Sequence, residues 1–283
     1  MAHPAFSSDS VAVITGGAAG IGLAAAVQFA KMGMRVCIAD LGEDRLAAAA
    51  EVIAAASSDG MKNVMTQECD VSKKDNLVAL EAAVQERFGG TDILMNNAAI
   101  QPGSDMFNAS GSWERILAIN LHGVINGTHV FAPAMIERGR PGLIINTGSK
   151  QGITTPPGDP AYNVAKSGVK AFTESLEHEL RNTEGAKLSA HLLIPGFVFT
   201  DLTRRDRVEK PDGAWVPEQV IDFMMSALEA GDFYILCPDN DVARPLDELR
   251  IRWAGDDIIE GRPALSRWHP DYGEAFSEFV KDV

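Results

Sequence analysis

Three side chains near the middle of the chain have the types and spacing for acid–base chemistry. Tyr162 and Lys166 lie four residues apart in a segment of helical pattern, so their side chains project from one face of that helix. A phenol with a pKa of about 10 is a poor base at neutral pH, but a nearby ammonium group favours the phenolate. Ser149 lies 13 residues upstream of Tyr162, at the end of a predicted strand. We predict that Tyr162 transfers a proton and that Ser149 holds the substrate oxygen beside it. A surface Tyr with a Lys four residues on is the alternative.

A glycine-rich segment provides a second chemical feature. Residues 15–22 read TGGAAGIG and lie between a predicted strand and a predicted helix. Glycines there allow the backbone to approach a pyrophosphate, whose charge then meets the positive end of the helix. Asp40 ends the next predicted strand, 20 residues after Gly20, where a carboxylate accepts hydrogen bonds from the adenosine ribose and repels the 2′-phosphate of NADP. We therefore predict NAD as the cofactor, although Arg35 and Arg45 flank that strand and could soften the preference. A glycine turn without a ligand, and an ordinary acid at a helix start, are the alternatives.

Short aliphatic strands and longer helices alternate along the chain and must position these residues. The strands are predicted at 11–14, 36–39, 64–67, 93–95, 143–146, 188–194 and 233–236. The helices are predicted at 21–32, 43–56, 76–88, 113–137, 161–181 and 218–230, with Asp159 and Pro160 suited to cap and open the fifth. Continuous apolar strands that alternate with helices indicate a doubly wound α/β fold with a parallel sheet.

The motifs together resemble the short-chain dehydrogenase/reductase family. The resemblance rests on T-G-x-x-x-G-x-G, Asn96-Asn97-Ala98-Ala99, Asn120, Ser149 and Tyr162-x-x-x-Lys166, and it covers roughly residues 9 to 238. It implies a Rossmann fold with a seven-stranded parallel sheet and NAD(P)-dependent interconversion of an alcohol and a carbonyl compound. In such a reaction Tyr162 takes the hydroxyl proton as a hydride passes to the nicotinamide, and returns a proton in the reverse direction.

The same resemblance assigns roles to individual residues. Lys166 also binds the nicotinamide ribose, and Asn120 holds a water in a proton relay to Lys166; a buried Asn that satisfies local backbone is the alternative for Asn120. The implied cofactor contacts are Gly16, Ala19, Gly20, Ile21, Gly22, Asp40, Asp70, Val71, Asn97, Ala98, Tyr162, Lys166, Pro195, Gly196, Val198 and Thr200.

The substrate cleft is expected to follow Ser149 and Pro195. The candidates are Gln151, Phe197, Phe199 and Leu202, with Ile153, Thr154 and Trp215 as further ones. This set favours an apolar or aromatic secondary alcohol. The cations of Arg204, Arg205 and Arg207 could bind a carboxylate or phosphate on the substrate, but we expect a solvated helix face.

Composition narrows the class of protein. The 283 residues are 46% apolar and 23% charged, and 25 Lys and Arg against 39 Asp and Glu give a net charge of −14. That charge opposes binding to nucleic acids or anionic membranes. No apolar run approaches the roughly 20 residues that span a bilayer, and the first ten residues have no export signal, so we expect a cytoplasmic protein. Cys37, Cys69 and Cys237 are expected to be buried thiols, and His122 and His129 packing residues rather than metal ligands.

The last 45 residues are not needed by the predicted sheet. We predict one Rossmann-type catalytic domain at 1–238 and a C-terminal extension at 239–283. Tyr272, Phe276 and Phe279 form an amphipathic helical stripe that must be covered. We expect the extension to pack over the cleft or across a subunit boundary of a homodimer or homotetramer.

The leading hypothesis is an NAD-dependent dehydrogenase of a secondary alcohol. A non-catalytic protein that senses NAD(H), and a carbonyl reductase that tolerates NADP, are the alternatives. The epimerase and dehydratase branch shares Tyr-x-x-x-Lys, but the spacing within Gly16 to Gly22 and the lack of a large C-terminal substrate domain disfavour it.

Overall fold

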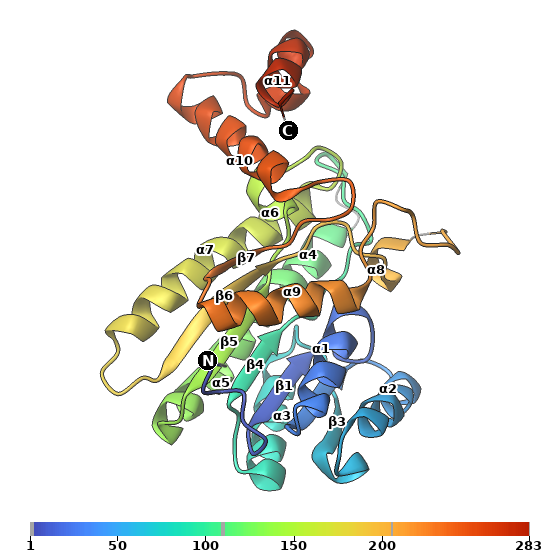
Figure 1. Ribbon diagram of the computed structural model, residues 1–283, viewed down its shortest axis with the longest axis vertical. Helices are drawn as coiled ribbons and strands as arrows, with labels where there is room; N and C mark the ends of the chain where they lie inside the picture. The colour runs from blue at the N-terminus through green and yellow to red at the C-terminus, as the bar shows by residue number, and fades with distance from the viewer. Residues whose placement is uncertain (1–2, 109–110, 205, 283) are drawn as a thin grey trace.

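Seven parallel strands form a single twisted sheet at the centre of the protein (Figure 1). The computed structural model describes residues 3–108, 111–204 and 206–282. The sheet order is β3-β2-β1-β4-β5-β6-β7, which confirms the predicted doubly wound fold. The strands are β1 Val11–Thr15, β2 Arg35–Asp40, β3 Val64–Glu68, β4 Ile93–Asn96, β5 Gly142–Thr147, β6 Leu188–Ile194 and β7 Tyr234–Leu236. Strand order reverses between β1 and β4, which is where ligands bind in open α/β sheets.

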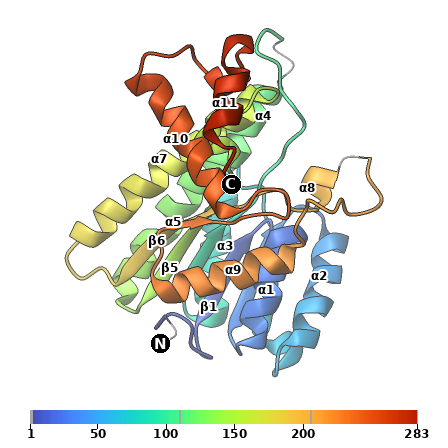
Figure 2. The same ribbon diagram turned by 45° about the horizontal axis from the view of Figure 1, so that its top comes forward.

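Helices cover both faces of the sheet because successive residues of each strand point to opposite faces. Ile14 packs in the core beneath one set of helices and Val13 in the core beneath the other. The first set is α1 Gly20–Lys31, α2 Glu43–Ala56 and α9 Pro217–Ala230, and the second is α3 Lys74–Phe88, α5 Gly123–Arg138 and α7 Pro160–Asn182 (Figures 1 and 2). Shorter elements are the 3₁₀ turn Gly60–Asn63, α4 Ser112–Leu117, α6 Gln151–Thr154 and α8 Asp201–Arg204.

Two local features differ from the predictions. The helix expected at 113–137 is divided, because residues Ala118–His122 form one π-helical turn between α4 and α5. The Asp159 side chain does not cap α7. Instead Ser104 Oγ accepts from the Ala161 N–H at 2.9 Å and donates to Asp159 Oδ1 at 2.5 Å. The loop after β4 therefore supplies the cap of the helix that carries Tyr162.

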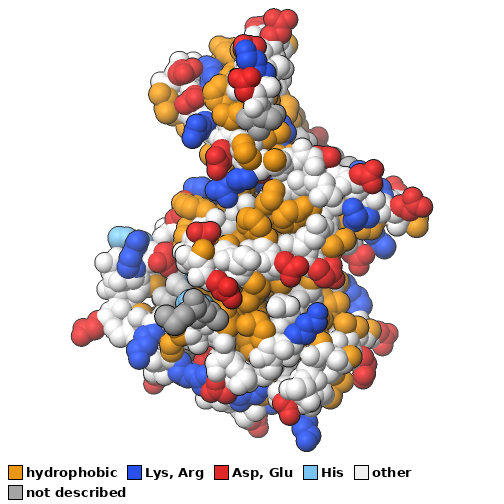
Figure 3. All heavy atoms as spheres, in the orientation of Figure 1, with side chains coloured by type: hydrophobic (Ala, Val, Ile, Leu, Met, Phe, Trp, Pro, Cys, Tyr) orange, Lys and Arg blue, Asp and Glu red, His pale blue; other side chains and the backbone are white. Residues whose placement is uncertain are grey.

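The C-terminal extension stands at one end of the molecule, where α10 Arg244–Ile259 packs against α6 (Figures 1 and 3). Two 3₁₀ turns, Ser266–Trp268 and Pro270–Tyr272, lead to α11 Gly273–Phe279. Phe276 and Phe279 of the predicted stripe pack on Trp253 of α10, with ring centroids 5.3 and 5.2 Å apart. The extension thus packs one side of these two rings, but Phe276 is only half-buried and Phe279 is exposed. The expected contact of the stripe with a second subunit stays a prediction.

The three cysteines are buried and free, as predicted. Burial raises the pKa of the Cys37 and Cys237 thiols to about 12 and that of Cys69 to about 11. Among the described residues, no helix has the length and apolar character needed to cross a membrane.

Candidate active site

A cleft of about 800 Å³ opens at the carboxyl ends of the strands, between the segments that follow β1, β2, β3, β4, β5 and β6. Most residues predicted to contact the cofactor line it. Gly22 does not, and neither does Asn120. Of the four principal substrate candidates, Gln151, Phe197 and Leu202 line the cleft and Phe199 does not.

The glycine segment folds as a tight loop that leads into the N-terminus of α1. Gly16 has φ +65°, and a Cβ there would lie 2.8 Å from Ala98 Cα. A Cβ on Gly22 would collide with the Gly16 carbonyl oxygen, so Gly22 supports the loop from beneath rather than lining the cleft. Gly20 has φ +53° and faces Thr200 of the segment after β6. The backbone therefore borders the cleft directly at this end.

Two carboxylates lie along the wall near the glycine loop. Asp40 Oδ2 accepts from the Ala18 N–H at 3.0 Å, and Asp40 Oδ1 accepts from the Leu41 N–H at 2.8 Å. Asp70 accepts from Ser72 Oγ at 2.6 Å and pairs with Lys73 at 3.5 Å, which together hold the pKa of the Asp70 carboxyl below its usual value. Both side chains are thus fixed by neighbours from their own or adjacent loops.

The arginines that flank β2 differ in position. Arg35 donates to the Phe88 carbonyl oxygen at 3.0 Å and does not line the cleft, whereas Arg45 of α2 does. Of these two arginines, Arg45 alone lines the cleft. Its effect on the choice between NAD and NADP stays a prediction.

Ser149, Tyr162 and Lys166 line one wall of the cleft together. Lys166 is 2% exposed, donates to the Thr147 carbonyl oxygen at 2.7 Å, and its ammonium lies 5.8 Å from the centroid of the Tyr162 ring. Ser149 Oγ accepts from the Gln151 N–H at 3.2 Å. The fold thus brings together a hydroxyl, a phenol and an ammonium group from the end of β5 and from α7.

Burial dominates the electrostatics of this group. It raises the pKa of Tyr162 to about 12, opposed by a hydrogen bond with Ser149 and increased further by the Asp159 carboxylate. Burial also lowers the pKa of Lys166 to about 8. With its pKa raised to about 12, Tyr162 is protonated at neutral pH. The prediction that the Lys166 ammonium, helped by an oxidised nicotinamide, favours the phenolate stays a prediction.

Asn120 lies in the π-helical turn and is fully buried. Its Nδ2 donates to the Ile100 carbonyl oxygen, and its Oδ1 accepts from the Ile100 N–H, both at 2.9 Å. The side chain thus anchors the loop after β4 to the helix. Its predicted role in a water relay stays a prediction.

The far end of the cleft contains groups that the sequence reasoning did not single out. Ile100 and Gln101, which directly follow the Asn-Asn-Ala-Ala motif, line the cleft. Thr147 and Lys150, which lie on either side of Ser149, line it too. Their positions next to these motifs could have identified them from the sequence.

Three further substrate candidates, Ile153, Thr154 and Trp215, do not line the cleft. Trp215 instead pairs with the segment after β6, donating its N–H to the Phe197 carbonyl oxygen and accepting from the Phe199 N–H, both at 2.9 Å. This pairing fixes the backbone of the segment that carries Phe197, and it explains why Phe199 and Trp215 serve the cleft only indirectly.

The predicted arginine cluster is only partly described. Arg204 pairs with Asp201 at 3.2 Å on an exposed surface. The Arg207 guanidinium lies 5.7 Å from the centroid of the Phe197 ring, and Arg205 lies outside the described residues. Within the described ranges, no group of three or more His, Cys, Asp and Glu side chains could hold a metal ion.

A family model and individual relatives both match this chain to dehydrogenases. Residues 10–211 match the family model for short chain dehydrogenases. The chain is 32% identical to D-beta-hydroxybutyrate dehydrogenase of Rhizobium meliloti, over 88% of this chain and 93% of that protein. It is also 32% identical to 3beta-hydroxysteroid dehydrogenase 2 of Eggerthella lenta, over 71% of this chain and 75% of that protein.

A solved structure agrees with these matches. The crystal structure of a short-chain dehydrogenase/reductase from Burkholderia phymatum in complex with NAD superposes with a TM-score of 0.79. That protein is 30% identical to this one, and the match covers 90% of this chain and 95% of that chain. The predicted resemblance is confirmed: the chain belongs to the short-chain dehydrogenase/reductase family of oxidoreductases.

Proposed function

We propose that this protein is an NAD-preferring dehydrogenase that interconverts an uncharged, apolar or aromatic secondary alcohol and its ketone. The observation that carries the proposal is one continuous cleft, with the glycine loop and Asp40 at one end and Ser149, Tyr162 and Lys166 at the other. Such a cleft has room for a dinucleotide beside a small substrate.

The residues at the first end fit a dinucleotide. The backbone at Gly16 and Gly20 borders the cleft without side chains, and it leads into the positive end of α1, where a pyrophosphate is favoured. The Asp40 carboxylate is held in place by two backbone N–H groups and would repel a 2′-phosphate. When bound, the oxidised nicotinamide accepts a hydride and adds positive charge near the phenol.

Ser149, Tyr162 and Lys166 have different roles in the proton transfer. Ser149 holds the substrate oxygen, and Tyr162 donates a proton to it during ketone reduction or removes one during alcohol oxidation. With its pKa of about 12, Tyr162 is in the acid form at neutral pH, ready for reduction. Oxidation requires that its pKa be lowered, and the ammonium of Lys166 nearby supports the phenolate once it forms.

The apolar lining and the paired charge at the substrate end of the cleft support an uncharged substrate. The lining there includes the apolar side chains Ile100, Phe197 and Leu202. The Lys150 ammonium is paired with two carboxylates, Asp239 at 3.2 Å and Asp247 at 2.6 Å. It is therefore not left to bind a carboxylate of the substrate, so a hydroxysteroid-like alcohol suits this cleft better than a short hydroxy acid.

The test is turnover on a panel of aryl, alicyclic and steroid-like secondary alcohols and one short hydroxy acid, followed by the absorbance of NADH. We expect turnover of uncharged alcohols with NAD. Tyr162→Phe should reduce turnover roughly 10²–10⁴-fold, the size of a lost general acid–base group, while NADH still binds. Tyr272→Phe, in the extension, is the matched control. NADH binding without turnover of any alcohol or ketone would instead support a non-catalytic sensor.

A further inference from the structure

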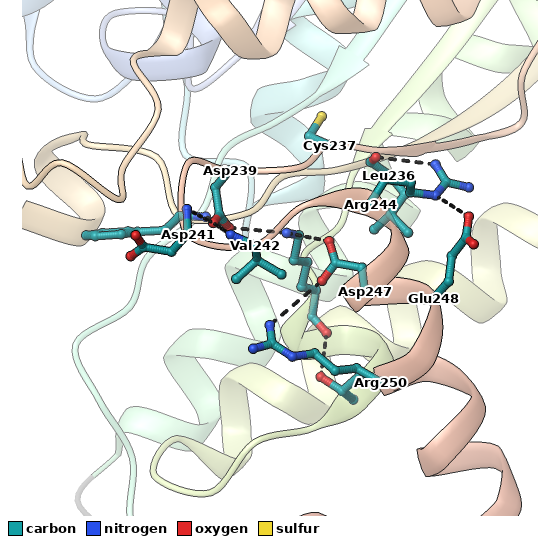
Figure 4. Close-up of polar contacts among 12 residues, drawn as sticks. Leu236, Cys237, Asp239, Asp241, Val242, Arg244, Asp247, Glu248 and Arg250 are labelled. Carbon is teal, nitrogen blue, oxygen red and sulfur yellow. Dashed lines mark hydrogen bonds and ion pairs between the residues drawn. The ribbon is translucent and has the colours of Figure 1, made fainter. Parts of the chain in front are cut away.

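A cluster of charged side chains joins the C-terminal extension to the catalytic wall. The ammonium of Lys150, which directly follows Ser149, pairs with Asp239 at 3.2 Å and with Asp247 at 2.6 Å. Figure 4 shows these two carboxylates and their polar contacts. The side chains of Asp239 and Asp247 are only 5% and 6% exposed. Asp239 follows β7, and Asp247 lies in the first turns of α10. We call these three residues the carboxylate clamp.

The Asp239 carboxylate ties three segments together. Its Oδ2 accepts from the Phe197 N–H at 3.1 Å as well as from Lys150, and its Oδ1 accepts from the Val242 N–H at 2.8 Å. A Cβ on Gly196 would collide with Asp239 Oδ2. The glycine after Pro195 therefore allows a carboxylate from beyond β7 to reach the segment that borders the cleft after β6.

The Lys150 backbone is equally well connected. Its N–H donates to the Pro195 carbonyl oxygen at 3.4 Å, and its carbonyl oxygen accepts from the Ile153 and Thr154 N–H groups, both at 3.1 Å. Lys150 therefore begins α6, the short helix on which α10 packs. Lys150 directly follows Ser149 and is held at both its backbone and its ammonium. The clamp therefore acts on the short segment that carries Ser149.

Asp247 differs from Asp239, whose carboxylate accepts from the Phe197 and Val242 N–H groups. The contacts of the Asp247 carboxylate are with cationic side chains. Its Oδ2 lies 2.6 Å from the Lys150 ammonium, and its Oδ1 lies 4.0 Å from Arg250 Nη1 on the next turn. Taking a carboxylate out of water is costly unless it is paired, and one carboxylate, Asp239, already neutralises Lys150. Asp247 also has the Arg250 guanidinium beside it, and it contacts the Lys150 ammonium from α10. A contact from this second element restrains the direction of the Lys150 side chain as well as balancing its charge.

We propose that the carboxylate clamp makes the C-terminal extension a working part of the active site: Asp247 and Asp239, acting through Lys150, are positioning residues for Ser149. The proposal rests on the proposed function. It differs from simple packing of a tail, because the extension would determine where the substrate oxygen is held. Productive geometry tolerates only small displacements, since misplacement by about 1 Å can cost roughly 10²-fold in rate.

Asp247→Asn tests the clamp with little change in shape. We expect kcat for the best alcohol of the panel to fall roughly tenfold or more, with Kd for NADH changed by less than about twofold because Asp247 does not line the cleft. Glu248→Gln is the matched control: it neutralises the next residue of α10, whose pair with Arg244 is half exposed and does not touch Lys150. That variant should keep the wild-type kcat.

A double-mutant cycle separates positioning from loss of folding. If Asp247 acts through Lys150, Asp247→Asn should reduce kcat far less in a Lys150→Met background than in the wild type. Hydrogen exchange of residues 148–154, measured without substrate, should be faster in Asp247→Asn than in Glu248→Gln. Additive losses in kcat, or a lowered melting temperature with unchanged kcat and unchanged exchange at 148–154, would overturn the proposal. Absence of wild-type turnover would refute the proposed function, and the exchange measurement would still decide whether the clamp holds this segment.

Discussion

Neutralising Asp40 should move the cofactor preference from NAD towards NADP. Asp40→Asn removes the negative charge and keeps one side-chain oxygen, so it can still accept from either the Ala18 or the Leu41 N–H. If the remaining oxygen keeps the bond from the Ala18 N–H, the link to the glycine loop survives and only the bond from the Leu41 N–H is lost. The change in preference then reports mainly the charge. This makes Asn a cleaner substitution than Ala.

The magnitude follows from Coulomb's law and the position of the carboxylate. Two unit charges about 5 Å apart at an effective dielectric constant of about 20 repel by about 3 kcal/mol. A 2′-phosphate carries more than one charge, which increases the repulsion. Asp40 is partly exposed, and Arg45 lines the same part of the cleft, so solvent and a cation both reduce it. We expect a net change of about 1–2.5 kcal/mol, which is a roughly 5- to 70-fold shift in the ratio of kcat/KM for NADP to that for NAD.

The assay is kcat/KM for both cofactors with one alcohol, at low and high salt. Asp44→Asn is the matched control, because it removes the same charge from the first turn of α2 without lining the cleft. The shift in Asp40→Asn should shrink at high salt, and Asp44→Asn should leave the ratio near that of the wild type. An equal ratio in Asp40→Asn and the wild type, or a wild type that already prefers NADP, would refute the electrostatic argument.

Two further predictions concern stability. Burial raises the pKa of the Cys37 thiol from 9.0 to about 12. The neutral thiol therefore stabilises the folded state fully below pH 9, and this contribution is lost as the pH rises towards 12. Cys37→Ala should reduce the loss of unfolding free energy in this range by up to about 1.4 kcal/mol per pH unit. Equal alkaline slopes in urea titrations of the two proteins would contradict this. Asn146 is fully buried, accepts from Asn96 Nδ2 at 2.9 Å and donates to Thr173 Oγ1 at 3.0 Å. Asn146→Ala should therefore lower the free energy of urea unfolding by about 2–4 kcal/mol, because buried polar groups lose their partners; a loss below about 1 kcal/mol would show that water or rearrangement replaces them.

The sequence predicted the sheet well, because β1, β4 and β5 are buried along their whole length and consist mainly of aliphatic residues. The strand Leu188–Ile194 has its predicted bounds, and β1, β2 and β5 each exceed theirs by one or two residues. The cleft residues follow from the same regularity: Ser149 and Pro195 come soon after strands that end at one edge of the sheet.

Long-range polar contacts were beyond the sequence reasoning. Asp159 has the residue type of a helix cap, but Ser104, 55 residues upstream, takes the backbone N–H because the loop after β4 passes beside α7. Lys150 and Asp247 are separated by almost a hundred residues, and neither stands in a recognisable motif. Helical periodicity also did not reveal the π turn at Ala118–His122, whose Asn120 binds the Ile100 backbone.

These long-range contacts share a pattern that explains how loops can hold a precise site. At each step along the sheet, a side chain beside one strand reaches the segment beside its neighbour. Asp40, the last residue of β2, binds the loop after β1. Asn97 after β4 donates to the Thr15 and Gly16 carbonyl oxygens, both at 3.2 Å, and accepts from Thr147 of β5 at 3.2 Å.

Asp239 after β7 continues the series, because it binds Phe197 after β6 and Lys150 after β5. The cleft edge is therefore cross-linked from β2 to β7 by side chains rather than by the strands alone. Loss of one link frees a segment that its own strand cannot hold, so substitutions at these polar residues should impair catalysis before they impair folding. The carboxylate clamp closes this series at the C-terminal end, so the extension restrains the cleft edge by the same kind of polar contact that Asp40 makes at the glycine loop.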